Sequence, residues 1–198
     1  MNLSKSEFTS LCKRSLRGKG HHWGICEDLS NALLALALNR FPAPNILLEA
    51  LNTENSKLIQ IFNIVDAKAY ETSNKINGTF YDPILILGLI SVHRDSKMPS
   101  LEVSLDNESF ILVDDLIIGN RSYSRKKINT ISFCAEKPNS TIKDDFVTRV
   151  AIDETTLKAI DYWSKLTYAP STEQSRNLGA GSETVSYTHL TLPTSVTV

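Results

Sequence analysis

The sequence has few cysteines and no long apolar run. Its three cysteines, Cys12, Cys26 and Cys134, form no C-x-x-C pair. An odd number without paired spacing argues against a disulfide framework and is typical of the reducing cytosol. The longest apolar stretches, near Leu33–Leu38 and Ile84–Val92, are shorter than the ~20 residues that a membrane-spanning helix needs. Because no apolar segment near Met1 suggests a signal peptide, we expect a soluble cytoplasmic protein with no membrane association.

The chain also lacks an excess of either charge. Its 21 Lys and Arg residues and 22 Asp and Glu residues give a formal net charge of −1. Such a balance offers no overall attraction to nucleic acid, so we expect no nucleic-acid partner. A dense basic cluster, Arg121 with Arg125–Lys127, is better explained as a charged sheet edge that discourages aggregation.

Charged residues are missing altogether from residues 184–198, which contain no Lys, Arg, Asp or Glu. Within this tail, Val185–Thr194 resembles a translated sequencing adaptor, a scar typical of metagenomic assembly. Such segments are excluded from fold reasoning. The sequence therefore predicts a single domain over residues 1–183 and a disordered, non-native tail over residues 184–198.

The first half of the chain predicts helices. Leu3–Arg17 is amphipathic, and Ser4 and Glu7 have the spacing of a capping box. After a glycine-rich link, Trp23–Arg40 predicts a second helix, and the short connection predicts a helical hairpin. Further along, Pro44–Leu51 predicts a short helix, Leu58–Val65 fits either a strand or a helical turn, and Asp82-Pro83 predicts the start of an unusually apolar, central helix over Ile84–Arg94.

The second half changes to β-branched and aromatic segments separated by turn residues. These predict consecutive antiparallel strands over Ser100–Leu105, Phe110–Ile118 and Ile128–Ala135, with a further strand over Val147–Ile152. Asp153 then predicts the cap of a last helix, on which Leu157, Ile160, Trp163 and Leu166 face inward. Helices followed by strands and a final helix predict an α+β fold with a mostly antiparallel sheet.

The glycine-rich link is the densest group of special residues, and it runs from Arg17 to Asp28. Gly18, Lys19 and Gly20 precede a helix, where backbone N–H groups bind anions readily. However, a helix rather than a strand precedes the link, and its spacing is not that of a dinucleotide-binding loop. The alternative is that the glycines permit a tight turn and close helix packing.

Titratable residues in the same stretch suggest candidate chemistry. Glu27 with His21 or His22 could perform general acid–base catalysis, and Cys26 with a histidine could form a nucleophile. His22 and Cys26 are four residues apart and would share a helix face, so a zinc site is a further alternative, with His93, Cys134 or Glu27 completing it. We assign no metal and no cofactor from the sequence.

A second polar stretch lies near the C-terminus, over Ser171–Gly181. It includes Ser175 and Arg176, and an arginine with hydroxyl groups is a plausible clamp for a carboxylate or phosphate. A solvent-exposed polar cap on the fold explains the same residues equally well.

Three motifs carry a resemblance to a known family. They are Arg17-Gly-x-Gly-x-x-Trp-Gly-x-x-Glu-Asp28, Asp82-Pro-Ile-x-x-x-Gly88 and the stretch from Ala169 to Gly181. With these motifs the chain up to about Gly181 resembles a bacterial family called domain of unknown function 3726. Lys19 departs from the family pattern, which has a small residue there, and so does Asp82, where the pattern has cysteine. The resemblance supports the fold class and implies no activity.

From these observations we expect a protein that binds a small anionic metabolite where the glycine-rich link meets Ser171–Gly181. The expected ligand-binding residues are Arg17, Gly18, Gly20, Trp23, Ser175 and Arg176, and the expected proton-transfer residues are Glu27, His21 and His22. An enzymatic and a purely binding version both remain open. The alternative is a non-catalytic accessory protein that docks a protein partner or a second copy through an apolar patch on Ile84–Val92 or on the sheet.

Overall fold

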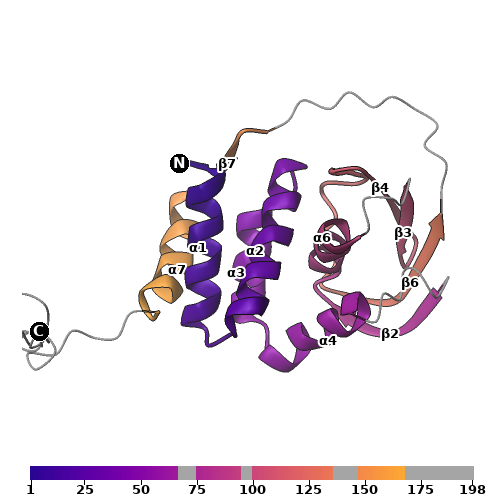
Figure 1. Cartoon of the computed structure of the whole chain (residues 1–198), viewed down its shortest axis with the longest axis horizontal. Helices are drawn as coiled ribbons and strands as arrows, with labels where there is room; N and C mark the ends of the chain where they lie inside the picture. Colours follow the sequence, from indigo (N-terminus) through magenta and orange to yellow (C-terminus); the bar gives the residue numbers. More distant parts are fainter. Residues whose placement is uncertain (67–74, 95–99, 136–146, 168–198) are drawn as a thin grey trace, which may run out of the picture. The chain divides into compact units, whose positions relative to one another are not determined.

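The predicted helical hairpin is formed by α1 (Lys5–Gly18) and α2 (Trp23–Leu38) in the computed structural model (Figure 1). The predicted capping box is confirmed, because the Ser4 side chain accepts from the Glu7 N–H while the Glu7 carboxylate accepts from the Ser4 N–H. The structure describes residues 1–66, 75–94, 100–135 and 147–167, and Met1–Thr167 forms one compact unit. The predictions for Ser171–Gly181 and for the tail lie outside the described residues.

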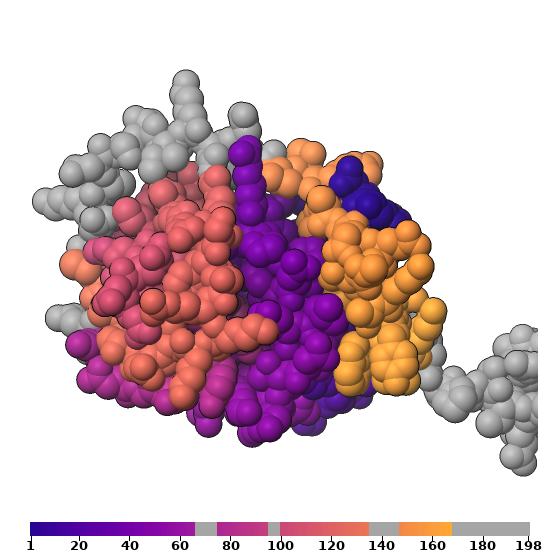
Figure 2. Space-filling model, turned by 180° about the vertical axis from the view of Figure 1, so that it is seen from behind, coloured from indigo at the N-terminus to yellow at the C-terminus, as the bar shows by residue number. Residues whose placement is uncertain are grey.

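Further helices pack on both sides of this hairpin. Helix α7 (Glu154–Lys165) lies beside α1, α3 (Ala43–Asn52) packs against α2 and α7, and α4 (Asn55–Asp66) contacts α6 (Pro83–His93). Seen from behind, α7 and the strands of the sheet lie on opposite sides of the purple N-terminal helices (Figure 2). Leu58–Val65, for which the sequence left two alternatives, belongs to the helix α4.

Helix α6 is buried on all sides over its first two turns, as its composition predicts. Its residues from Pro83 to Ile90 are buried, and Figure 1 shows it between α2 and the sheet. A Cβ on Gly88 would lie 3.0 Å from the Ala32 carbonyl oxygen and 2.9 Å from Leu36 carbons, so a glycine lets α2 approach closely. Burial removes residues 84–90 from the apolar docking surface considered above, whereas Val92 in the last turn is 39% exposed. In the described part of the chain no helix is both long and apolar enough to cross a bilayer.

The strands form an antiparallel sheet in the order β2-β6-β3-β4-β5. Their bounds are Lys75–Tyr81 for β2, Leu101–Leu105 for β3, Glu108–Val113 for β4, Leu116–Ile118 for β5 and Lys127–Ala135 for β6. Along β3, buried residues alternate with partly exposed ones, so that Leu101, Val103 and Leu105 lie buried on one face. This pattern is typical of a sheet with one covered face. Helices and an antiparallel sheet together confirm the predicted α+β class.

The structure corrects two sequence-based expectations and shortens a third. The segment Phe110–Ile118 is two strands, because the chain turns at Asp114, whose φ is 48°. The strand expected over Val147–Ile152 is β7 (Arg149–Ala151), which pairs with β1 (Asn2–Ser4) in a separate two-stranded sheet and ties the two ends of the unit together. Leu166 does not face inward, since it follows the end of α7 and is 51% exposed.

Candidate functional site

The glycines of the link between α1 and α2 are explained largely by packing. A Cβ on Gly18 would lie 1.8 Å from the Trp163 carbonyl oxygen, so only glycine lets the end of α1 meet α7. Gly20 has a φ of +99°, a conformation that L side chains rarely adopt. By contrast, a Cβ on Gly24 would meet nothing within 4 Å. These contacts favour the alternative in which the glycines serve a tight turn.

Lys19 is directed at the end of another helix. Its Nζ donates to the Ala50 carbonyl oxygen at 3.1 Å and also to the Thr53 carbonyl oxygen. These carbonyl groups lie at the C-terminal end of α3, where a cation is favourable for the helix dipole. Burial lowers the pKa of Lys19, and the carboxylate of Asp82 partly opposes that shift. The hydrogen bonds of this ammonium group thus connect the C-terminal end of α3 to the link.

His21 is a buried part of the same turn. Its side chain is only 3% exposed, and its carbonyl oxygen accepts from Arg17 Nη1 at 2.8 Å and from Cys26 Sγ at 3.6 Å. Its Nε2 is buried and has no hydrogen-bond partner among the described residues. Burial, with smaller contributions from Lys19 and His22, lowers the pKa of His21 and favours the neutral imidazole. His22 is exposed and occupies the N-cap position of α2 without a side-chain capping bond.

Glu27 lies on the surface, and within the described part of the chain it forms no hydrogen bond or ion pair with either histidine of the link. Its side chain is 62% exposed, and its carboxylate accepts from Lys13 Nζ at 2.9 Å, a hydrogen bond that lowers the pKa of Glu27. A general base is usually tuned toward neutral pH rather than away from it. Burial raises the pKa of the Cys26 thiol, which opposes formation of a nucleophilic thiolate. Among the described residues, no group of three or more His, Cys, Asp or Glu side chains could hold a metal. The proton-transfer role stays a prediction.

Arg17 and Trp23 are brought together at the surface. The Arg17 guanidinium carbon lies 5.4 Å from the centroid of the Trp23 ring, within the range of a cation–π contact. Trp23 is 61% exposed even so. A single exposed aromatic ring is normal on a protein surface, so the exposure of Trp23 gains meaning only from the residues around it. The other two predicted ligand-binding residues, Ser175 and Arg176, lie outside the described residues.

A groove beside Trp23 runs along α1. It measures about 580 Å³ and is lined by Lys5, Ser6, Thr9, Ser10, Lys13, Arg14, Trp23 and Leu34. Six of these residues recur in adjacent pairs every four positions, which places them in one stripe along the helix. That spacing is visible in the sequence, but our sequence analysis used only the buried face of α1 and missed it.

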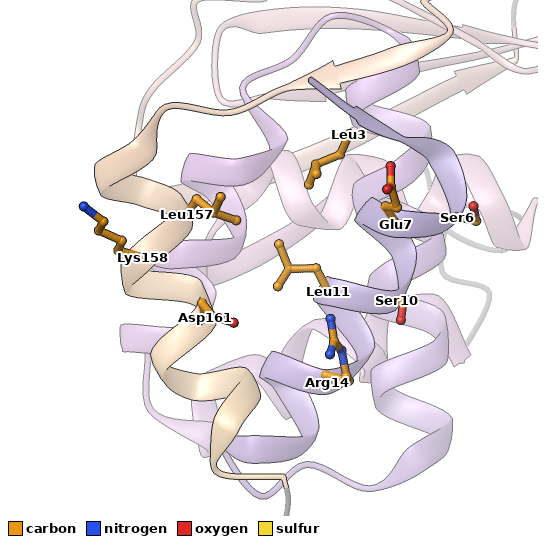
Figure 3. Close-up of a pocket in the computed structure, with 9 residues that line it drawn as sticks. All are labelled: Leu3, Ser6, Glu7, Ser10, Leu11, Arg14, Leu157, Lys158 and Asp161. Carbon is orange, nitrogen blue, oxygen red and sulfur yellow. The ribbon is translucent and has the colours of Figure 1, made fainter. Parts of the chain in front are cut away.

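A second hollow, slightly smaller than the groove, lies on the other side of the same stripe. Between α1 and α7, a cavity of about 530 Å³ is lined by Leu3, Ser6, Glu7, Ser10, Leu11, Arg14, Leu157, Lys158 and Asp161 (Figure 3). Its carboxylates already have local roles, since Glu7 caps α1 and Asp161 pairs with Lys165 at 2.8 Å. The cavity therefore mixes both signs of charge, whereas the groove beside Trp23 has three cationic side chains and no carboxylate among its described lining residues.

The comparisons with known proteins bear on the N-terminal part of the chain. Residues 3–76 match the model of a family described as "Protein of unknown function (DUF3726)". The match includes the glycine-rich link and the groove residues of α1, and it ends before Asp82-Pro83. No curated protein and no solved structure matched the chain. The resemblance predicted from the motifs is thus confirmed over residues 3–76, where the chain is similar to a family of unknown function.

Proposed function

We propose that this protein binds a small anionic metabolite in the groove between the polar face of α1 and Trp23. The observation that carries the proposal is the pairing of three cationic side chains, Lys5, Lys13 and Arg14, with an exposed tryptophan in one hollow. The cations supply attraction for a phosphate or carboxylate, and the hydroxyl groups of Ser6, Thr9 and Ser10 supply donors to its oxygens. The Trp23 ring forms a wall for an apolar part of the ligand.

Charge complementarity favours an anion over other small ligands. Of the three cations, Lys13 pairs with Glu27, an exposed residue that does not line the groove. An exposed pair of this kind contributes roughly 0–1 kcal/mol, so an incoming anion can displace it readily. The proposal is one of binding alone and includes no chemical step. It assigns Trp23 the ligand-binding role that the sequence predicted.

The test uses tryptophan fluorescence of the full chain. The sequence has two tryptophans, so Trp163→Phe leaves Trp23 as the single reporter. Phenyl phosphate, which joins an aromatic ring to a dianion, is titrated beside inorganic phosphate, benzoate and the cation phenylammonium. We expect saturable quenching by phenyl phosphate that weakens as salt is added. We expect no such response to phenylammonium.

Two charge-matched double variants decide the location of binding. Lys5→Gln/Lys13→Gln removes two charges from the groove and should weaken binding by about tenfold. Lys57→Gln/Lys75→Gln removes the same charge from α4 and β2 and should leave the affinity unchanged. The absence of saturable quenching by any anion of the series would refute the proposal, as would equal affinity in the two double variants.

A further inference from the structure

The outward side of α7 carries two neighbouring stripes of different chemistry. One stripe is charged and consists of Glu154, Lys158, Asp161 and Lys165. The other has no charge and consists of Thr155, Ala159, Tyr162 and Leu166. In both stripes the intervals are four, three and four residues, which keeps the members on one side of a helix. Among the described residues that line the cavity between α1 and α7 or the groove beside Trp23, none belongs to the uncharged stripe.

The uncharged stripe exposes two large apolar side chains. Tyr162 is 61% exposed, Leu166 is 51% exposed, and Figure 2 shows α7 in orange at the surface. Leu166 follows the last residue of α7 but keeps helical dihedral angles, with φ −70° and ψ −11°, so it continues the stripe. The Tyr162 ring lies edge-on against Trp163, with centroids 5.8 Å apart. A single exposed apolar side chain is normal, whereas two on one stripe form a patch that a partner can cover.

The order of charges on α7 is complementary to itself when two copies of the helix run antiparallel. Along the charged stripe the order is acidic, basic, acidic, basic, and it becomes the opposite order when read from the other end. An antiparallel second copy therefore places its Lys165 opposite Glu154 and its Asp161 opposite Lys158. A parallel second copy would place like charges opposite each other. A patch that meets itself is what a two-fold symmetric dimer requires, so the charges favour a second copy in this one orientation.

The four charged side chains already lie in pairs along the helix. Glu154 pairs with Lys158 at 2.7 Å, and Asp161 pairs with Lys165 at 2.8 Å. An antiparallel second copy joins these pairs into one network across the interface. Exposed pairs contribute little one at a time, whereas several charges in a network contribute more. Antiparallel helices also set the positive N-terminal end of each helix dipole beside the negative C-terminal end of the other.

The uncharged stripe fits the same arrangement. When Glu154 lies opposite Lys165 of the second copy, Tyr162 lies opposite its Ala159 and Leu166 lies opposite its Thr155. A large side chain thus faces a small one at each position, as interdigitating helix faces require. Tyrosine is also among the residues that contribute most to binding at protein interfaces.

We infer that a second copy of this chain docks on this face of α7 in antiparallel orientation and forms a two-fold symmetric dimer. Tyr162 and Leu166 of each copy fill the contact, and the charged stripes flank it. The contact is small, because α7 has 12 residues and is about 18 Å long. Interfaces of this size are typical of weak complexes, so we expect a dissociation constant of about 100 µM.

Sedimentation velocity of the full chain tests the inference, at concentrations from roughly tenfold below to roughly fivefold above that constant. We expect the chain to change from monomer to dimer over this range. Leu166→Gln should weaken the association by about tenfold. Ile59→Gln, which changes a 48% exposed apolar side chain on α4, is the matched control and should leave it unchanged. A monomer at every concentration, or equal weakening by the two substitutions, would overturn the inference.

Two double variants test the role of the charges. Glu154→Lys/Asp161→Lys makes the charged stripe wholly cationic, and Lys158→Glu/Lys165→Glu makes it wholly anionic. Each variant alone should remain monomeric, whereas an equimolar mixture should associate at least as tightly as the unchanged chain. Adding Leu166→Gln to both should weaken the mixed association by about tenfold. Association of either variant alone, or a mixture that stays monomeric, would overturn the inference.

The dimer and the anion groove are independent proposals. No residue exchanged in the dimer variants lines the groove beside Trp23. Leu166→Gln should therefore bind phenyl phosphate as tightly as the unchanged chain does, and Lys5→Gln/Lys13→Gln should dimerise normally. Each proposal can then fail while the other holds.

Discussion

The glycine-rich link and the polar face of α1 are neighbours in the sequence but differ in what their side chains do. In the link, Gly18 meets α7, Lys19 holds the end of α3, and His21 is buried with its carbonyl bonded to Arg17. Across the face of α1, lysines and hydroxyl groups point into open grooves. The most conspicuous residues of the chain therefore hold elements together, while a less conspicuous stripe lines the groove in which we propose that a ligand binds.

The largest difference in stability is expected between alanine substitutions at Gly18 and Gly24. Gly18→Ala places a Cβ 1.8 Å from the Trp163 carbonyl oxygen, so α1 and α7 must move apart, and we expect a loss of about 3 kcal/mol in the free energy of unfolding. Gly24→Ala is the matched control, because its Cβ meets nothing and alanine favours a helix; it should stabilise by roughly 0.5 kcal/mol. Urea unfolding measures both. Equal effects of the two substitutions would show that the link is not a packing element.

The next largest difference in stability is expected between variants of Lys19 in the link and Lys13 on α1. Lys19→Met removes hydrogen bonds from a partly buried ammonium to the last carbonyl groups of α3, and we expect destabilisation of about 1.5–3 kcal/mol. Lys13→Met removes only the exposed pair with Glu27 and should cost roughly 0–1 kcal/mol. Urea midpoints of the two variants test the difference. A loss for Lys19→Met no greater than that for Lys13→Met would contradict a structural role for Lys19.

His21 should make the link sensitive to acid. Because burial lowers the pKa of His21 in the folded protein, the unfolded chain binds more protons as pH falls below the ordinary histidine pKa of about 6.5. The stability contributed by neutral His21 is thus complete above that pH and is lost as pH falls toward the folded-state pKa. His21→Gln should flatten this part of the stability profile, measured by urea unfolding from neutral to mildly acidic pH, whereas His22→Gln should retain it. Profiles that coincide for wild type and His21→Gln would exclude His21 as the source.

The sequence predicts local features of this molecule better than distant contacts. Capping at Ser4 and Asp153 depends on a few neighbouring residues, and the structure confirms both caps. The insertion of β6 between β2 and β3, and the pairing of β1 with β7, depend on segments far apart in the chain. Periodicity gives the buried face of a strand but not its partner, so neither pairing could be predicted.

The same distinction applies to the candidate site. The link was identified from its composition, but the carbonyl oxygen of Trp163 that explains Gly18 lies on a helix near the other end of the described chain. The stripe on α1 could be recognised in the sequence from its four-residue spacing, because all of its residues lie on one helix. By contrast, a small pocket lined by Asn45, Asp82 and Tyr123 joins three separate segments, and only folding brings these residues together.

The smallest expected effect concerns Glu27, and it separates the two interpretations of this residue most directly. If Glu27 performs proton transfer, its removal abolishes turnover and leaves ligand affinity unchanged. If it is only the exposed partner of Lys13, Glu27→Gln frees the Lys13 ammonium for the ligand, and phenyl phosphate should bind about two- to fivefold more tightly, since an exposed pair contributes roughly 0–1 kcal/mol. Glu54→Gln, which breaks the exposed pair with Lys57 outside the groove, is the control and should leave the affinity unchanged. The same fluorescence titration measures all three proteins, and weaker binding by Glu27→Gln would mean that the carboxylate itself contacts the ligand.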